Sequence, residues 1–121
     1  MKRLGIVLVA LVLLGTTACS RIRFLPLDQA HMQGAAFAST TAKVKVGSKI
    51  KFINDSTATH ILVVGQDGKW VAANGAPADL NNATGKLVLG GGEVDIAFDT
   101  PGTYTITCTV HPAMLITVTV G

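Results

Sequence analysis

Hydrophobic and polar residues alternate in short runs from Gly34 to the C-terminus, and this period of two predicts β-strands. The alternation is clearest at 43–46, 49–53, 94–98, 103–108 and 116–120. Because successive side chains of a strand point to opposite faces, each run would have one apolar and one polar face. Glycine-rich turns separate the runs, and no helical period is sustained. The pattern predicts an all-β sandwich.

The runs and the turn residues between them predict the strand boundaries. The expected strands are 35–38, 43–46, 48–54, 60–65, 69–72, 85–89, 93–98, 102–109 and 114–120. Residues 73–84 are expected to form a longer loop with a helical turn from Ala78.

The N-terminal third of the chain has a different pattern. Residues 1–18 combine Lys2 and Arg3 with an apolar run and then small residues, which is typical of a secretory signal. Cys19 follows directly and resembles the lipid-attachment cysteine of a bacterial lipoprotein, although Thr16 departs from the usual aliphatic residue. An ordinary signal peptide or an uncleaved anchor are the alternatives. Residues 19–33 are expected to be a membrane tether, and residues 34–121 the folded domain.

Charge and composition narrow the function. Lys2 and Arg3 supply two of the three net positive charges, so the predicted mature chain has no basic stripe for nucleic acid. About 100 residues are enough for one hydrophobic core. Residues 90–92 (Gly-Gly-Gly) lack the lysine of a phosphate-binding loop, and no catalytic triad is visible, so no enzyme activity is expected.

Four side chains suggest a metal site. Cys108, His111 and Met114 lie within seven residues, and His60 lies upstream at the start of an apolar run. Each residue alone has an ordinary reading: a strand-edge histidine, a buried thiol or a methionine that fills the core. Together, two imidazoles, a thiolate and a weakly bound thioether are the ligand set of a blue-copper site. Zinc is chemically compatible with the same imidazoles and thiolate.

The order of these residues resembles that of the cupredoxins, in particular the amicyanin and plastocyanin group. The loop C-T-V-H-P-A-M after P-G-T-Y is the most specific part, and V-K-V-G, F-I-N and His60 precede it in the family's order. The resemblance spans about residues 37–120. It implies a Greek-key β-sandwich of about seven to nine strands, one copper ion, and ligation by His60, Cys108, His111 and Met114. It also implies that electrons leave through His111, beside the small apolar residues Pro112 and Ala113.

Three further residues are expected to surround the ligands: Asn54, Ile61 and Val110. Many cupredoxins have asparagine after the first histidine, and this chain has Ile61, whose backbone N–H is still expected to donate to the sulfur of Cys108. Many have proline where this chain has Val110. Since valine retains its N–H, we expect a second hydrogen bond to the sulfur. His31 and Met32 match no position of the family and are expected to be solvated in the tether.

The resemblance implies a copper protein that carries single electrons between membrane-associated redox proteins outside the cytoplasm. A cytochrome, an oxidase or a reductase would be the donor or acceptor, and the protein would be a monomer, anchored on the periplasmic or cell-surface side. An extracytoplasmic copper carrier or chaperone with the same ligands is the main alternative. A metal-free β-domain for adhesion or assembly is a third. The absence of asparagine at position 61 favours the copper-carrier alternative slightly.

Overall fold

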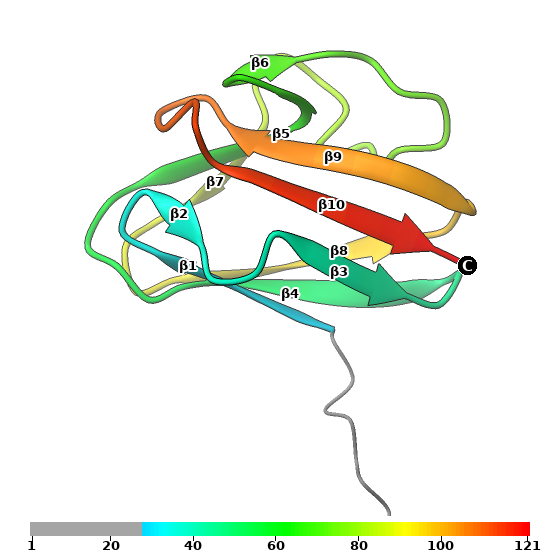
Figure 1. Cartoon of the computed structure of the whole chain (residues 1–121), viewed down its shortest axis with the longest axis horizontal. Coiled ribbons are helices and arrows are strands. Elements are labelled where there is room, and N and C mark those ends of the chain that lie inside the picture. Colours follow the sequence, from blue (N-terminus) through cyan, green and yellow to red (C-terminus); the bar gives the residue numbers. More distant parts are fainter. Residues whose placement is uncertain (1–27) are drawn as a thin grey trace, which may run out of the picture.

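Two facing β-sheets form the domain (Figure 1). The computed structural model describes residues 28–121, in which there are ten strands and no helix. The first sheet has four strands in the order β2-β1-β4-β8. Its strands are β1 (Gln29–Gln33), β2 (Ala36–Phe37), β4 (Ser48–Asn54) and β8 (Glu93–Phe98).

The second sheet has six strands in the order β3-β10-β9-β5-β6, and β7 also pairs with β5. Its strands are β3 (Thr41–Val44), β5 (His60–Gln66), β6 (Lys69–Trp70), β7 (Lys86–Val88), β9 (Gly102–Cys108) and β10 (Leu115–Val120). The pairs β1–β4 and β3–β10 are parallel, whereas β9 is antiparallel to both β10 and β5. The predicted all-β sandwich is therefore confirmed.

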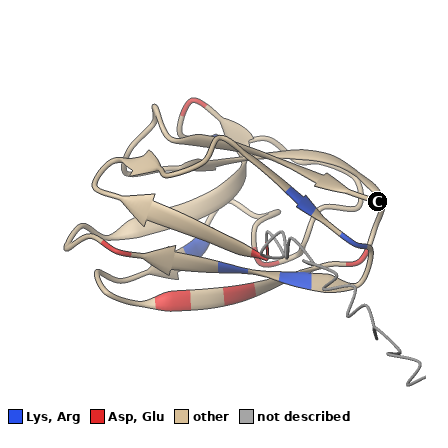
Figure 2. Cartoon of the chain, turned by 60° about the horizontal axis from the view of Figure 1, so that its bottom comes forward, with Lys and Arg blue, Asp and Glu red and all other residues tan. Residues whose placement is uncertain are grey.

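Alternation along the strands explains why the sheets stack. In β4, Ile50 and Phe52 point into the core, while Lys49 and Lys51 lie on the outer face with Glu93 and Asp95 of β8 (Figure 2). Nζ of Lys51 is 3.5 Å from a carboxylate oxygen of Glu93, a partly exposed contact that contributes little to stability. The ranges predicted for β4 and β8 agree with the structure because charged residues alternate with buried apolar ones along both strands.

The core lies between the inner faces of the two sheets. It is built of large aliphatic and aromatic side chains, and burying each one stabilises the fold by about 1.5–3 kcal/mol. The largest that are fully buried include Ile50, Phe52, Leu62, Ile96, Phe98, Ile106 and Ile116. Phe37 packs edge-on against Phe52, and Phe98 lies beside Tyr104. The ends of β5 and β9 are therefore fixed to a well-packed interior.

The expected boundary between tether and domain at Gly34 is wrong. Residues 29–33 form β1, which pairs in parallel with β4 and turns into β2. Ala30 and Met32 point into the core, and Met32 is fully buried rather than solvated. His31 is partly exposed, and its Nδ1 lies 2.6 Å from a carboxylate oxygen of Asp55. Alternation in β1 depends on only one alanine and one methionine, which is why the pattern alone did not reveal it.

Smaller differences have local causes. The strand expected at 43–46 is found at Thr41–Val44, because these residues pair with the end of β10 and the chain turns after Lys45. Residues 77–81 form a single turn in which the N–H of Asn81 donates to the carbonyl of Pro77, close to the expected position. The predicted signal segment 1–18 and Cys19 lie outside the described residues. Within residues 28–121 no helix is long and apolar enough to span a membrane.

Candidate metal centre

The segment between β9 and β10, which we call the ligand loop (residues 108–114), carries three of the four predicted ligands. Cys108 is the last residue of β9 and is fully buried, because the alternation of β9 directs Tyr104, Ile106 and Cys108 into the core. The N–H of Met114 donates to the carbonyl of His111 at 3.0 Å, which closes a tight turn before β10 begins. The loop is therefore anchored at both ends by strands of one sheet.

His60 reaches the same place from a distant part of the chain. It is the first residue of β5, which lies beside β9 with Leu62 opposite Cys108. His60 is fully buried. Because β5 and β9 are antiparallel, the start of β5 lies next to the end of β9. The pairing thus brings an imidazole from 48 residues upstream against the thiol.

The three candidate ligand atoms form a small triangle. Sγ of Cys108 is 3.6 Å from Nδ1 of His60 and 3.8 Å from Nδ1 of His111, and the two nitrogens are 3.2 Å apart. A first-row metal ion lies about 2.0 Å from an imidazole nitrogen and about 2.3 Å from a thiolate. In a trigonal plane such an ion separates its ligand atoms by about 3.5 Å. The observed triangle therefore fits one such ion.

The protonation state of His60 favours metal binding. Burial lowers the pKa of His60 from its usual 6.5, and the neighbouring imidazole of His111 lowers it further. The backbone of Gly34 raises the pKa of His60, but by less than burial and His111 lower it. Nε2 of His60 is buried and makes no hydrogen bond with the described residues. A neutral imidazole retains the lone pair that a metal ion needs.

Met114 and Cys108 both lie in the interior. Met114 immediately precedes β10 and is 1% exposed, so its thioether is shielded from water on the core side of the ligand loop. Its role as a weak fourth ligand stays a prediction. Cys108 is a free thiol. A buried thiol with two imidazoles beside it is suited to a soft or borderline metal such as copper.

Backbone groups of β5 contact the sulfur and the ligand loop directly. The N–H of Ile61 lies 3.4 Å from Sγ of Cys108, which confirms the expected amide–sulfur contact. The N–H of Thr109 donates to the carbonyl of Ile61 at 2.9 Å. The second amide–sulfur bond expected from Val110 is wrong: among residues 28–121, Ile61 is the amide that bonds this sulfur. Val110 lies beyond the end of β9 with its side chain 49% exposed.

Asn54 has a larger role than the sequence suggested. Its side chain is buried at the end of β4, and Nδ2 lies 2.7 Å from the carbonyl oxygen of Ala58. The same nitrogen also contacts the carbonyl oxygens of Val88 and Leu89. Oδ1 accepts hydrogen bonds from the N–H and the hydroxyl of Ser56. Asn54 therefore shapes the turn that leads into His60 and fastens it to the end of β7.

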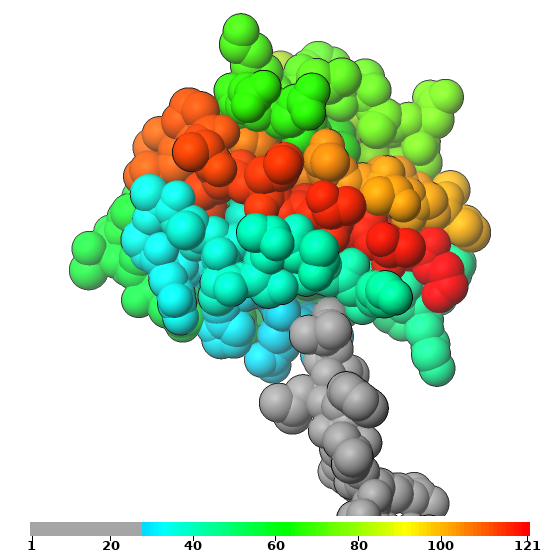
Figure 3. Space-filling model, viewed as in Figure 1, coloured from blue at the N-terminus to red at the C-terminus, as the bar shows by residue number. Residues whose placement is uncertain are grey.

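One edge of the site reaches the surface. His111 is partly exposed, and the adjacent Pro112 and Ala113 are exposed. Val110 and Leu115 add apolar surface at 49% and 40% exposure. Figure 3 shows this part of the chain, in orange to red, at the surface next to the cyan β1–β2 hairpin. His111 is therefore the candidate ligand that lies closest to solvent.

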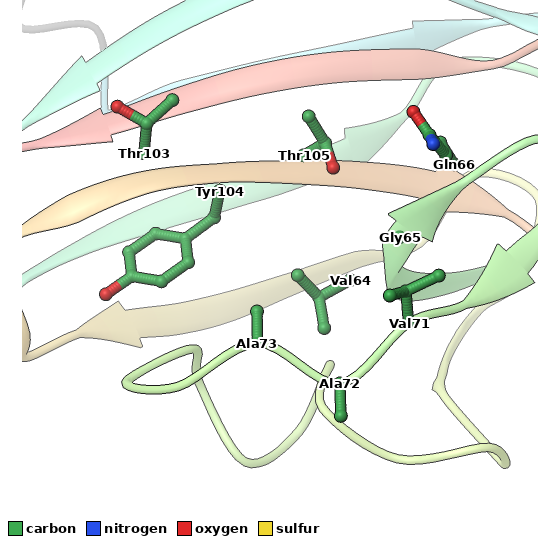
Figure 4. Close-up of a pocket in the computed structure, with 9 residues that line it drawn as sticks. All are labelled: Val64, Gly65, Gln66, Val71, Ala72, Ala73, Thr103, Tyr104 and Thr105. Carbon is green, nitrogen blue, oxygen red and sulfur yellow. The ribbon is translucent and has the colours of Figure 1, made fainter.

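A cavity lies in another part of the domain. It has a volume of about 220 Å³ and is bounded by β5, β9 and the segment after β6, where Val64, Ala73 and Tyr104 line it (Figure 4). None of the four predicted ligands lines this cavity. In the candidate metal centre His60 and Cys108 are fully buried, and His111 is partly exposed.

Comparisons with known proteins agree with this geometry. The sequence model of the family described as copper binding proteins, plastocyanin/azurin family, matches residues 27–121. No curated protein matches the chain.

Solved structures of amicyanin have a similar fold. A reduced Cu(I) form of a proline-to-glycine variant at pH 4 is 24% identical with a TM-score of 0.61, over 77% of this chain and 80% of that chain. Amicyanin from Paracoccus versutus is 18% identical with a TM-score of 0.60, over 77% of this chain and 79% of that one.

Replacing Asn54 with alanine should weaken metal binding without touching a ligand. The change leaves three carbonyl groups without their shared donor, so we expect a loss of about 2 kcal/mol or more in unfolding free energy. Copper affinity should fall about tenfold or more, because His60 is no longer held in place. Chemical denaturation and competitive copper titration measure both effects.

Asn82→Ala is the matched control. Nδ2 of Asn82 also donates to two carbonyl groups, and its Oδ1 accepts a hydrogen bond from the N–H of Gly85, in the loop between β6 and β7. The control should keep parental copper affinity. Equal losses of affinity in both variants would contradict the role assigned to Asn54.

Proposed function

The chain belongs to the plastocyanin/azurin family of copper-binding proteins, and from this we propose that it is a type 1 copper protein that carries single electrons. Members of this family transfer electrons and do not transform a substrate, so the chain is not an enzyme. In this proposal His60, Cys108 and His111 hold one copper ion, and Met114 is the weak fourth ligand.

One observation carries the proposal. Two buried or partly buried imidazole nitrogens and one buried thiol sulfur lie within 3.2–3.8 Å of one another, on a domain of the copper-binding family. Bound copper supplies a one-electron couple between Cu(I) and Cu(II). The residues would hold the ligand atoms at fixed positions, and burial keeps water from His60 and Cys108. Little rearrangement then accompanies a change of oxidation state.

The contacts around the sulfur favour electron transfer over copper delivery. Backbone groups of Ile61 contact both Sγ of Cys108 and the N–H of Thr109. Asn54 fixes the turn that precedes His60. A delivery protein must release its ion to an acceptor, whereas these contacts restrain each side of the site. The absent asparagine at position 61 is offset by backbone bonds from the same residue.

We infer that electrons enter and leave at His111. This imidazole is partly exposed among the exposed residues Pro112 and Ala113, with Val110 beside them. A small apolar surface around a redox centre suits brief contacts with a donor or acceptor such as a cytochrome, an oxidase or a reductase. A monomer would keep this surface free.

The location outside the cytoplasm is part of the proposal and is supported by the sequence. Residues 1–18 have the composition of an export signal, and Cys19 stands where a lipoprotein acquires its lipid. An acylated Cys19 would hold the domain on the periplasmic or cell-surface side of a membrane. Cys108 would then be the sole thiol of the mature chain, and a bound metal ion would protect it from oxidation.

Loading the domain of residues 28–121 with Cu(II) tests the ligand assignment. The parent should show an intense visible thiolate-to-copper band that disappears and returns on reduction and reoxidation. Cys108→Ser should lose the band while circular dichroism reports the same β-sheet content. A colourless loaded parent, or a Cys108→Ser variant with an unchanged spectrum, would overturn the proposal.

Introducing a charge beside His111 tests the electron route. Ala113→Lys should slow electron self-exchange between oxidised and reduced copies about tenfold at low salt, because two like charges meet when these surfaces touch. Line broadening in proton NMR measures the rate. Thr119→Lys, an exposed position near the C-terminal end of β10, is the control and should retain the parental rate. Equal slowing in the two variants would argue against His111 as the exit.

Lipid attachment is tested on the full chain expressed in a bacterium. The parent should partition into detergent with the membrane fraction, and mass spectrometry should find acyl groups on Cys19. Cys19→Ser should lose the acyl mass and detergent partitioning, while its folded domain still binds copper. Equal partitioning without acyl groups would contradict the lipoprotein assignment.

A further inference from the structure

The turn between β5 and β6 lies against the ligand loop. Asp67 and Gly68 form a two-residue hairpin turn with φ values of +54° and +73°, and Gln66 pairs with Lys69 on either side. Positive φ at both positions is typical of the tight turn that matches the twist of a hairpin. Asp67 is the sole non-glycine residue of the described chain with positive φ.

Gly68 contacts the far side of the ligand loop. A Cβ built on Gly68 would lie 2.9 Å from Cβ of Pro112, and 3.0 Å from its Cα and Cγ. Real side chains essentially never approach so closely, so only glycine permits the observed packing. Pro112 directly follows His111. The backbone of the turn therefore supports the loop next to the exposed candidate ligand.

The same turn also reaches the near side of the loop. The N–H of Gly68 donates to Oγ1 of Thr107 at 3.1 Å. Thr107 is fully buried and directly precedes Cys108. One residue of the hairpin turn thus contacts the neighbours of two candidate ligands, one before the thiol and one after the imidazole.

Two backbone hydrogen bonds also restrain the ligand loop. The N–H of Thr109 is bound to Ile61, and the N–H of Met114 closes the turn at the carbonyl of His111. The first bond lies at the end of β9, and the second joins the middle of the loop to the residue before β10. Val110, Pro112 and Ala113 are exposed, and Gly68 packs against Pro112 on the outer part of the loop.

We propose that the turn at Asp67 and Gly68 is a positioning element that sets the place of His111 through Pro112, and that of Cys108 through Thr107. The expected effect of this turn on a bound copper ion rests on the proposed function. The contacts of Gly68 with Pro112 and Thr107 do not depend on that function. Gly68 acts through other residues and does not touch the metal.

The test compares two glycines with similar positive φ values. Gly68→Ala adds a methyl group that displaces Pro112, whereas Gly47→Ala adds it in open space at a φ of +81°. Both variants carry the cost of a left-handed alanine, about 1 kcal/mol. Only Gly68→Ala should shift the visible thiolate-to-copper band and the reduction potential of the copper-loaded domain.

A metal-free readout accompanies the copper measurements. In the apo-domain, Gly68→Ala should shift the amide resonances of Val110 and Met114 in ¹⁵N–¹H spectra and speed hydrogen exchange at Met114. Gly47→Ala should leave these resonances unchanged. If neither glycine variant moves the loop resonances or the copper spectrum, the proposed positioning role is overturned.

A second pair of variants covers the case in which Gly68→Ala does not fold. Thr107→Val keeps the shape of the side chain but removes the hydroxyl that accepts the hydrogen bond from Gly68. Thr107→Ser keeps that hydroxyl. The valine variant should shift the loop amides and the reduction potential, and the serine variant should restore both toward the parent. Equal behaviour of valine and serine contradicts the inference.

The outcomes separate this inference from the proposed function. If the parent binds no copper but Gly68→Ala still shifts the loop resonances, the positioning role is supported. The proposed electron-transfer function is then contradicted. Alternatively, the parent is blue while Gly68→Ala and Thr107→Val change neither the spectrum, the reduction potential nor the loop amide resonances. That result would contradict the positioning role alone.

Discussion

The antiparallel pairing of β5 with β9 is the constraint on which the site depends. It places Leu62 opposite Cys108, and therefore sets His60 beside the thiol although 48 residues separate them. A loop alone can gather three potential ligands, but it can also deform around whatever ion it meets. A ligand on the buried strand β5 limits this deformation. Moving His60 would disturb its pairing with Val88 of β7 and the adjacent pairing of Leu62 with Cys108, so the protein restrains the coordination geometry.

Much of this arrangement could be predicted from local patterns. β4 and β8 were located correctly because Lys49, Lys51, Glu93 and Asp95 mark their outer faces. The four candidate ligands were found because their residue types and order are specific to one chemistry. β1 was missed because Ala30 and Met32 give a weak alternation, and its identity as a strand depends on pairing with β4.

Contacts between distant segments could not be predicted in the same way. Asn54 was expected near the site, but the five hydrogen bonds of its side chain depend on how the turn before His60 folds against β7. The amide of Val110 was expected at the sulfur, yet only the geometry at the end of β9 decides which N–H groups reach it. The contact of Gly68 with Pro112 leaves no trace in the sequence beyond an ordinary Asp-Gly turn.

The incorporation of β1 into the first sheet would limit how far the domain could move from a lipid on Cys19. Only nine residues separate Cys19 from the start of β1 at Gln29. A chain of that length spans at most roughly 30 Å, even when fully extended. With a lipid at Cys19, the folded body would be confined to a thin layer above the bilayer. Its search for partners would be lateral diffusion in two dimensions, which favours proteins embedded in the same membrane over freely diffusing ones.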